Sequence, residues 1–294
     1  MTNPVTVTLS SVSFPLQASH DFGWLLERGE VFAVFDQQDS GNLSFGLMKD
    51  GKRSFVKYAG ARPVAYEGNP TDAIRRLTQA VPVYEALEHE HLIRLVDHFQ
   101  TPEGYAAVFD WAEGENLHPH WSYPPPAKYT HPDSPFYRYR QLPLERRLAS
   151  INNILTFHVH AARQGYVAID FYDGSLLYDF KTDTTKICDI DFYTTRPFVN
   201  EMGRMWGSSR FMAPEEFELG ADIDEITNVY NMGATAFVLL GGEQDRSLEK
   251  WEAGENLYRV AAKAVEPDRA SRYGSLAELQ ASWRQAGGAG DRFL

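Results

Sequence analysis

The sequence predicts an α+β protein whose first third is rich in strands and whose remainder is mainly helical. Short apolar segments between Val31 and Ala59 alternate with polar turns, which is typical of antiparallel strands. A long segment, Leu144–Gln164, carries an apolar stripe at helical spacing. At 294 residues the chain is long enough for one large domain or two smaller ones.

The composition is ordinary for a soluble globular protein, with 43% hydrophobic and 23% charged residues. The net charge of −12 argues against nucleic acid or an anionic membrane as a partner. The single cysteine, Cys188, excludes an internal disulfide and fits a reducing compartment. No signal-peptide pattern and no stretch of about 18 apolar residues is present. We therefore expect a cytoplasmic protein that binds neither nucleic acid nor a membrane.

The strand pattern is clearest in the segments VFAVFD, LSFGLM and RSFVKYA, within residues 31–59. Turns that contain glycine separate them, so three antiparallel strands are the simplest interpretation. Residues 1–28 alternate only weakly and are expected to form a short extension packed on this first part of the chain.

A helix is expected over Thr71–Ala80, with Thr71 or Asp72 as its N-cap. Pro82 is expected to break or kink this helix before it resumes over Tyr84–His89, because proline removes a backbone donor.

Residues 118–143 are dense in proline and aromatic residues. Proline at this density disfavours helix and interior strand, so we expect an ordered, extended loop. The loop could cover the second part of the chain, or it could bind a substrate or partner. Its histidines, His118, His120 and His131, lack the regular spacing of a metal site.

The most informative stretch contains two alternating runs, Ser175–Phe180 and Lys186–Ile190, joined by the polar turn Lys181–Thr185. This pattern predicts a β-hairpin. Asp170 precedes the hairpin and Asp191 follows it, so antiparallel pairing would bring the two carboxylates together. Paired acids in this position can hold a divalent cation and orient a hydroxyl nucleophile.

This arrangement resembles the catalytic and metal-binding loops of the protein kinase superfamily, in which H-R-D-x-x-x-x-N precedes a hairpin and D-F-G. Ala168-Ile169-Asp170 with Ser175 is similar to the first motif, and Asp191-Phe192-Tyr193 to the second. Further segments resemble motifs of the family in the same order: the strand with Lys57, the hinge-like Tyr105–Leu117, the A-P-E-like Gly207–Glu215, the helix-F-like Asn228–Gly242, and Ala264–Leu279 with Arg272 as the expected partner of Glu215.

The resemblance implies a bilobal protein kinase-like fold, with an antiparallel-sheet N-lobe containing one helix and a mainly helical C-lobe. Residues 1–28 would be an N-terminal extension, 29–111 the N-lobe and 112–285 the C-lobe. The proline-rich segment 118–143 would be an insertion in the C-lobe, and residues 286–294 a frayed tail.

The resemblance also assigns nucleotide-binding residues. Lys57 would contact the α- and β-phosphates of ATP, and Gly41 fits the last glycine of the phosphate-covering loop. Phe109 would lie beside the adenine pocket, and the backbone of Asp110 and Ala112 would hydrogen-bond the adenine edge.

For the chemistry, Asp170 would accept or orient the proton of a substrate hydroxyl. Asp191 and Ser175 would hold Mg²⁺ or Mn²⁺, with Asp173 as a nearby oxygen donor. The resemblance therefore implies an ATP-dependent, serine/threonine-type kinase that transfers the γ-phosphate of ATP to a hydroxyl of an unknown protein substrate.

The chain departs from the family pattern at supporting positions. Asp36 and Gln38 replace the two earlier glycines of the phosphate loop. The position of the helix-C glutamate falls on Ala80, which leaves Glu85 as the nearest candidate partner for Lys57.

Three further replacements lie near the expected catalytic loop. Tyr172 stands where the family has a lysine, Ile169 where it has an arginine, and Asn228 where it has an aspartate. A pseudokinase that binds a nucleotide or partner without turnover is therefore an alternative. A small-molecule phosphotransferase of the aminoglycoside or choline kinase type is another, but the segment Gly207–Glu215 and Arg272 count against it.

Overall fold

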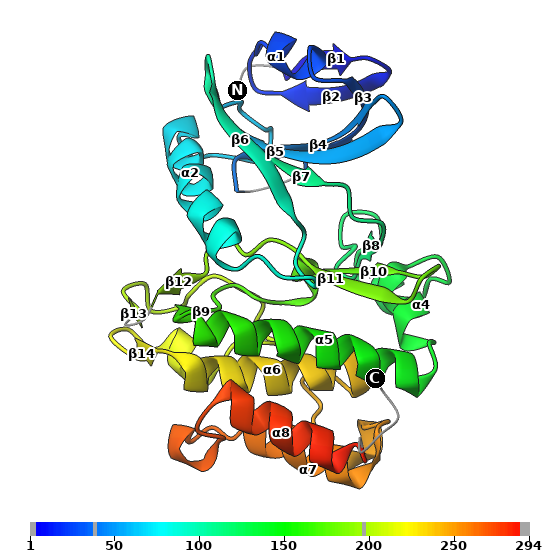
Figure 1. Cartoon of the computed structure of the whole chain (residues 1–294), viewed down its shortest axis with the longest axis vertical. Coiled ribbons are helices and arrows are strands. Elements are labelled where there is room, and N and C mark those ends of the chain that lie inside the picture. Colours follow the sequence, from blue (N-terminus) through cyan, green and yellow to red (C-terminus); the bar gives the residue numbers. More distant parts are fainter. Residues whose placement is uncertain (1–3, 38–39, 196–197, 289–294) are drawn as a thin grey trace. The chain divides into compact units, whose positions relative to one another are not determined.

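A computed structural model describes residues 4–37, 40–195 and 198–288. The chain divides into two compact units, Met1–Ala112 and Glu113–Leu294. The structure is α+β. The first unit contains an antiparallel five-stranded sheet with helix α2, and the second unit is mostly helical (Figure 1).

The sheet of the first unit has the strand order β3-β4-β5-β7-β6, and all neighbouring strands are antiparallel. Its strands are β3 (Glu30–Phe35), β4 (Asn42–Lys49), β5 (Lys52–Ala59), β6 (Leu95–Thr101) and β7 (Gly104–Asp110). The three predicted strands are thus confirmed as β3, β4 and β5. Asp50 and Gly51 both have positive φ, which suits the two-residue turn between β4 and β5.

One face of this sheet is covered by the N-terminal residues. They form a hairpin of β1 (Val5–Leu9) and β2 (Val12–Leu16), followed by the short helix α1 (Gly23–Leu26). Leu16 and Leu25 are fully buried against apolar residues of the sheet such as Phe45 and Tyr58. The residues expected to be an extension therefore supply part of the core of this unit.

Helix α2 (Pro70–Ala86) packs on the other face, where the ring of Tyr84 contacts Phe109 of β7. Its N-cap is Asn69, whose side chain accepts a hydrogen bond from the Thr71 N–H at 3.0 Å. The expected cap, Thr71 or Asp72, is therefore wrong. Pro70, the first helical residue, has no N–H that needs an acceptor, so the helix can begin there. It therefore starts before the first apolar residue of its helical pattern.

Pro82 does not interrupt α2, contrary to the prediction. Proline removes the hydrogen bond to the carbonyl four residues earlier, here Thr78. Pro82 is exposed, so the lost bond lies on the outer side of the helix, where water can replace it. The buried stripe that includes Leu77, Val81 and Tyr84 continues past this point and holds the helix to the sheet.

The second unit is built around its helices. They are α3 (Ala127–Thr130), α4 (Pro135–Arg140), α5 (Leu144–Arg163), α6 (Glu225–Leu240), α7 (Gly254–Ala264) and α8 (Leu276–Ala286). The predicted helix over residues 144–164 is confirmed as α5. Helix α6 is buried on all sides from Thr227 to Leu240, so it forms the centre of this unit.

Short strands complete the second unit. Strands β8 (Glu115–Asn116), β10 (Leu176–Asp179) and β11 (Thr184–Ile187) form one sheet in the order β11-β10-β8; two further pairs are β9 (Tyr166–Val167) with β12 (Thr194–Thr195) and β13 (Phe198–Val199) with β14 (Asp222–Ile223). The predicted hairpin is confirmed as β10 and β11, which pair antiparallel with Leu176 opposite Ile187.

The segment 118–143 is not wholly extended, because it contains the short helices α3 and α4. Pro126 is the N-cap of α3, and Pro135 occupies the first turn of α4. A helix start has no intrahelical acceptor for its first N–H groups, so proline is tolerated there. The prediction failed because it counted prolines without considering their position.

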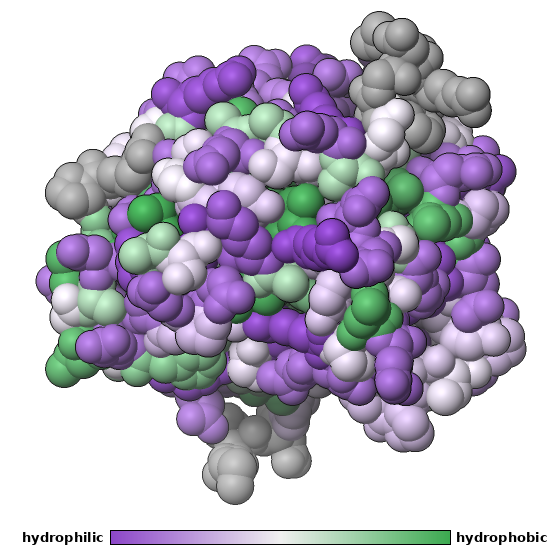
Figure 2. Space-filling model, turned by 90° about the horizontal axis from the view of Figure 1, so that it is seen from below, coloured by the Kyte–Doolittle hydropathy of each residue, from purple (hydrophilic) through white to green (hydrophobic). Residues whose placement is uncertain are grey.

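Across residues 4–37, 40–195 and 198–288, no helix combines the length and apolar character needed to cross a membrane. The face drawn in Figure 2 is largely hydrophilic, with hydrophobic residues scattered among polar ones.

Candidate functional site

Lys57 lies in the middle of β5 on the side of the sheet that α2 covers. It pairs with Ser44 of β4 and Ala107 of β7, and residues opposite each other in a ladder point to the same face. Val56 and Tyr58, its neighbours in β5, point to the opposite face and its core. Lys57 is 7% exposed, so its charge is largely withdrawn from water.

Two polar residues of β4 share this face with Lys57. Ser44 Oγ and Asn42 Oδ1 are buried and have no hydrogen-bond partner in the part of the chain that the structure describes. A buried polar atom without a partner is unfavourable and points to a missing ligand or water. Sequence reasoning missed both residues, although their alternation with Leu43 and Phe45 carries the signal.

Gly41 precedes β4 and has a φ of +81°, which favours glycine. A Cβ atom at this position would lie 2.7 Å from the ring of Tyr66. Arg76 donates hydrogen bonds to the Ser40 carbonyl at 2.7 Å and to the Tyr66 hydroxyl at 3.2 Å, which holds the ring in place. Gly41 therefore makes room for Tyr66 on this side. Gln38 lies outside the described residues.

The expected hinge begins at the end of β7. Phe109 is 1% exposed and lies between Phe55 and Tyr84. The Asp110 N–H donates to the Arg94 carbonyl at 2.9 Å, and its carboxylate forms an ion pair with the Arg94 guanidinium. The N–H of Asp110 is thus already used within the first unit. Ala112, the other expected contact, is the half-buried last residue of this unit.

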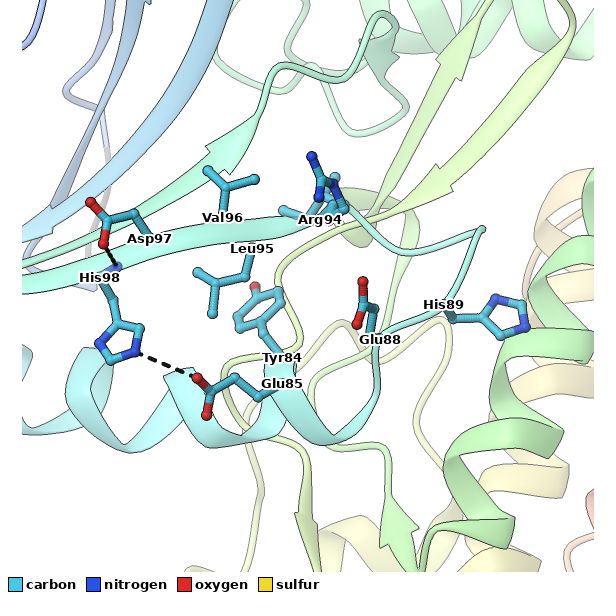
Figure 3. A pocket seen from close by; sticks show the side chains of 10 residues that line it. Tyr84, Glu85, Glu88, His89, Arg94, Leu95, Val96, Asp97 and His98 are labelled. Carbon is cyan, nitrogen blue, oxygen red and sulfur yellow. Dashed lines mark hydrogen bonds and ion pairs between the residues drawn. The ribbon is translucent and has the colours of Figure 1, made fainter.

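Glu85 does not serve as the partner of Lys57. It is exposed, and its carboxylate lies 3.5 Å from His98 of β6. Figure 3 shows this pair at the edge of a pocket of about 380 Å³ between the end of α2 and the start of β6. Among the predicted nucleotide-binding and catalytic residues, none lines this pocket.

In the second unit, Asp170 and Asp189 adopt the same unusual backbone conformation on either side of the β10–β11 hairpin. Their φ values are +61° and +55°, a region that aspartate enters more readily than most residues. The Cys188 N–H donates to the Ser175 carbonyl at 2.9 Å, and the Ser175 N–H donates to the Tyr172 carbonyl at 2.9 Å. These bonds link the loop after Asp170 to the residue that precedes Asp189.

Two tyrosines report where the carboxylates lie. Burial raises the pKa of Tyr172, and the charges of Asp189 and Asp170 raise it further. Burial also raises the pKa of Tyr193 well above its usual value, with Asp170 and Asp189 again contributing. The charges of Asp170 and Asp189 thus act on the same two tyrosines. Because the preceding Cys188 N–H is bound to the Ser175 carbonyl, Asp189 joins the candidate site.

Sequence reasoning chose Asp191 because a phenylalanine follows it. Asp191 is half-buried in a turn closed by the hydrogen bond from the Tyr193 N–H to the Ile190 carbonyl at 3.0 Å. Asp189 lies two residues after the end of β11, in the string Lys-Ile-Cys-Asp whose first two residues end the strand. Its place just after a strand is the signal that could have identified Asp189.

Ser175 is 1% exposed, and its Oγ has no hydrogen-bond partner among the described residues. Hydroxyl and carboxylate oxygens are the ligands that Mg²⁺ prefers. No group of three or more His, Cys, Asp and Glu residues suited to a metal occurs in the described ranges. Ser175 with one or two carboxylates fits Mg²⁺, which is commonly held by few carboxylates together with substrate phosphates.

Asp173 is not placed to serve as an oxygen donor for a metal. Its carboxylate is fully buried, with Lys128 Nζ at 2.5 Å, Arg210 at 2.8 and 3.0 Å, and His118 Nδ1 at 3.1 Å. Burial alone would raise the pKa of Asp173, but the hydrogen bond from His118 and the charges of Lys128 and Arg210 outweigh it and hold the pKa well below its usual range. Asp173 thus joins the 118–143 segment to residues 207–215.

The residues before Asp170 are anchored by an amide and by apolar packing. Asn228 Oδ1 accepts from the Ala168 N–H at 2.7 Å, and Asn228 Nδ2 donates to the Ala168 carbonyl at 2.8 Å. Asn228, which stands where the kinase family has an aspartate, therefore binds both backbone groups of Ala168. Ile169 is buried beside Met205 and Met212, so this position contributes packing in place of charge.

The segment Gly207–Glu215 lies close to Asp170. A Cβ atom added at Gly207 would lie 3.4 Å from Asp170 Oδ1. At the end of the segment, Arg272 donates to both carboxylate oxygens of Glu215, at 2.7 and 3.0 Å, and both side chains are buried. The expected Glu215–Arg272 pair is present.

His158 of α5 fixes the position of Tyr193. Burial lowers the pKa of His158 to about 4, so its ring is neutral. The Ile154 carbonyl can only accept, so His158 Nδ1 carries the proton, and Nε2 accepts from the Tyr193 hydroxyl at 2.8 Å.

Glu216 is a buried acid whose protonation should control stability. Burial raises the pKa of Glu216 to about 7, despite hydrogen bonds from the Ala213 N–H and from Asn231 Nδ2 at 2.7 Å. An unfolded glutamate titrates near its ordinary value of about 4.5. Between these values the folded state binds more protons, so the free energy of unfolding falls as the pH rises.

Glu216→Gln is therefore expected to become progressively more stable than the wild type as the pH rises. The difference in unfolding free energy should grow by roughly 2.5 kcal/mol between pH 5 and pH 8. Urea denaturation across this range measures it. Glu218→Gln, an exposed neighbour, serves as control and should show a flat difference. A flat difference for Glu216→Gln as well would contradict the raised pKa.

No protein family model matches this sequence. Evidence for a function therefore comes from the surroundings of Lys57 in the first unit, from those of Asp170 and Ser175 in the second, and from the order of the motifs.

Proposed function

We propose that this chain is an ATP-dependent phosphotransferase of the serine/threonine protein kinase type, with a bilobal protein kinase-like fold and a cytoplasmic location. Two buried hydroxyls without a hydrogen-bond partner among the described residues, those of Ser44 and Ser175, carry the proposal. Ser44 lies opposite Lys57 in the strand register of the first unit, and the Ser175 carbonyl accepts the Cys188 N–H in the second. Lys57 and Ser175 are at positions where the kinase motifs have contacts to a nucleotide and its metal.

Each residue then has a defined role. Lys57 binds the α- and β-phosphates of ATP, and Asp170 orients the substrate hydroxyl and takes up its proton. Ser175 and Asp189, with Asp191 as the alternative carboxylate, supply oxygen ligands for Mg²⁺ or Mn²⁺. Such an ion neutralises charge that develops on the phosphates during transfer.

Two features outside the loops support the proposal. Asn228 anchors the loop that carries Asp170, and the buried pair of Glu215 with Arg272 fixes the end of the segment beside it. These contacts hold the proposed catalytic residue and its surroundings in one geometry. Phosphoryl transfer depends mainly on the positioning of the reacting groups and on electrostatic stabilisation, so such support is what it requires.

A second candidate function is binding of a nucleotide or partner without turnover. One observation in its favour is that the ring of Tyr66 occupies the space beside Gly41. Another is that Glu85 pairs with His98 and not with Lys57. Both features remove supports for the phosphates that the kinase motifs normally supply.

The two functions are distinguished by incubating the purified protein with γ-labelled ATP, generic protein substrates, and Mg²⁺ or Mn²⁺, with EDTA as control. Metal-dependent transfer of label to serine or threonine supports the kinase. Binding of ATP without transfer under any of these conditions supports the second function.

The same assay tests which carboxylate holds the metal. Asp189→Asn is expected to lower metal-dependent transfer about tenfold more than Asp191→Asn, because Asp189 directly follows Cys188, whose N–H is bound to the carbonyl of the proposed metal ligand Ser175. Titration of activity with Mn²⁺ should show a higher metal requirement for the Asp189 variant. The reverse order of the two variants would return this role to Asp191.

A further inference from the structure

Ser44 of β4 carries a buried hydroxyl for which the fold supplies no partner. The residue is 1% exposed, and its Oγ forms no hydrogen bond within the described residues, not even with Lys57 directly opposite in β5. Residues opposite each other in a ladder have Cβ atoms about 5 Å apart, so a group bound by one side chain can also reach the other. An unmade hydrogen bond at such a position costs stability, which favours a ligand that completes it.

Within the first unit, the charges around Ser44 favour an anionic ligand. On this face, paired residues of neighbouring strands form three rows, which are Phe35, Ser44, Lys57, Ala107 and His98; Ala33, Gly46, Phe55, Phe109 and Leu95; and Asn42, Ala59, Tyr105 and Gln100. Lys57 is the only residue of these rows that carries a permanent charge. The residues that α2 buries are uncharged, and the carboxylate of Glu85 lies exposed beside His98 of the edge strand β6. This face therefore offers a cation and a hydroxyl to a ligand, which suits an anion.

The two polar groups of this face that have no partner differ in their chemistry. Asn42 Oδ1 can only accept a hydrogen bond, whereas the Ser44 hydroxyl can donate one. The oxygens of an ionised phosphate also only accept, so Ser44 fits a phosphate and Asn42 Oδ1 does not. A side-chain donor is needed here, because Asp36 and Gln38 stand where glycines would let the backbone approach the phosphates closely.

We propose that the Ser44 hydroxyl donates a hydrogen bond to the same phosphate of the nucleotide that Lys57 binds. The inference rests on the proposed function, since it takes the role of Lys57 from there. Ser44 is thereby a phosphate-binding residue that a strand supplies in place of the glycine-rich loop. Phe35, in the same row as Ser44, is 44% exposed, so this row reaches solvent at the edge of the sheet.

The test compares Ser44→Ala with the wild type by calorimetric titration of the full-length protein. The ligands are ADP with Mg²⁺, and adenosine, which has no phosphate. We expect Ser44→Ala to weaken ADP binding about tenfold, near the lower end for a hydrogen bond to a charged group, and to leave adenosine binding unchanged. Ser44→Thr keeps the hydroxyl and should retain most of the affinity for ADP.

Thermal unfolding without ligand separates a binding role of the hydroxyl from a structural one. Removing a buried hydroxyl that forms no hydrogen bond leaves no other group without a partner, so the midpoint of Ser44→Ala should equal or exceed that of the wild type. A lower midpoint, or an equal loss of affinity for ADP and adenosine, overturns the inference. Ser54→Ala is the matched control and should leave ADP binding unchanged, because Ser54 of β5 pairs with Leu47 on the opposite face of the sheet.

Transfer of label from ATP distinguishes a failure of this inference from a failure of the proposed function. Transfer by the wild type together with unaltered ADP binding by Ser44→Ala would overturn the inference alone. Binding of ADP that depends on Ser44, without transfer to any substrate, would overturn the kinase activity and leave the inference standing. Absence of both nucleotide binding and transfer in the wild type overturns both.

Discussion

Asp170→Asn is expected to lower the rate of phosphoryl transfer by about 10²–10⁴-fold, the usual contribution of a positioned acid or base. An amide keeps the shape of the side chain but can no longer take up the proton of the substrate hydroxyl. ATP binding should change little, because the proposed phosphate contact is Lys57. Steady-state kinetics with labelled ATP measures both quantities.

Asp222→Asn is a suitable control, since this aspartate is exposed in the same unit. Its kcat should equal that of the wild type. Transfer by Asp170→Asn within a factor of a few of the wild type would remove Asp170 from the proposed mechanism, even if Lys57 and Asp189 proved essential.

Glu215→Ala is expected to lower the free energy of unfolding by about 3–5 kcal/mol, because it leaves Arg272 buried without its counter-charge. Arg272→Ala should cost a similar amount. It removes two bonds to Glu215 and further donors to the backbone carbonyls of Glu266 and Pro267, although Arg269 still reaches Glu215 at 2.6 Å. Chemical denaturation of the single and double variants measures the coupling, expected to be about 1–3 kcal/mol.

The pair Glu255–Arg259 provides the comparison, because it spans one turn of α7 and both side chains are exposed. A double-mutant cycle there should give about 0.3–0.5 kcal/mol. Additive losses for Glu215 and Arg272 would show that their hydrogen bonds contribute no net coupling.

Local patterns predicted the elements of the first unit well, and the failures have physical causes. Strands β3, β4 and β5 follow from short apolar runs separated by turns, although β4 is buried on both faces from Asn42 to Leu47. The start of α2 and its passage through Pro82 could not be predicted in this way. They depend on the side chain of Asn69 and on which side of the helix faces water.

The β10–β11 hairpin was predictable because alternating runs flank a short polar turn. The Glu215–Arg272 pair joins residues 57 positions apart and was expected only from the resemblance to protein kinases. Asp173 was assigned wrongly because its partner Lys128 lies 45 residues earlier, in a segment whose helices were not foreseen. Ser44 was overlooked because a single strand does not show what lies across the sheet.

The two hydrogen bonds between Asn228 and Ala168 bear on how ionic strength should affect the loop that carries Asp170. An amide donates and accepts at once, so it satisfies both backbone groups of Ala168, whereas a carboxylate could only accept. Neither partner carries a net charge, so dissolved ions cannot screen the attraction between them. Raising the ionic strength should therefore weaken the proposed contact of Lys57 with a charged nucleotide, while the loop that carries Asp170 stays in place.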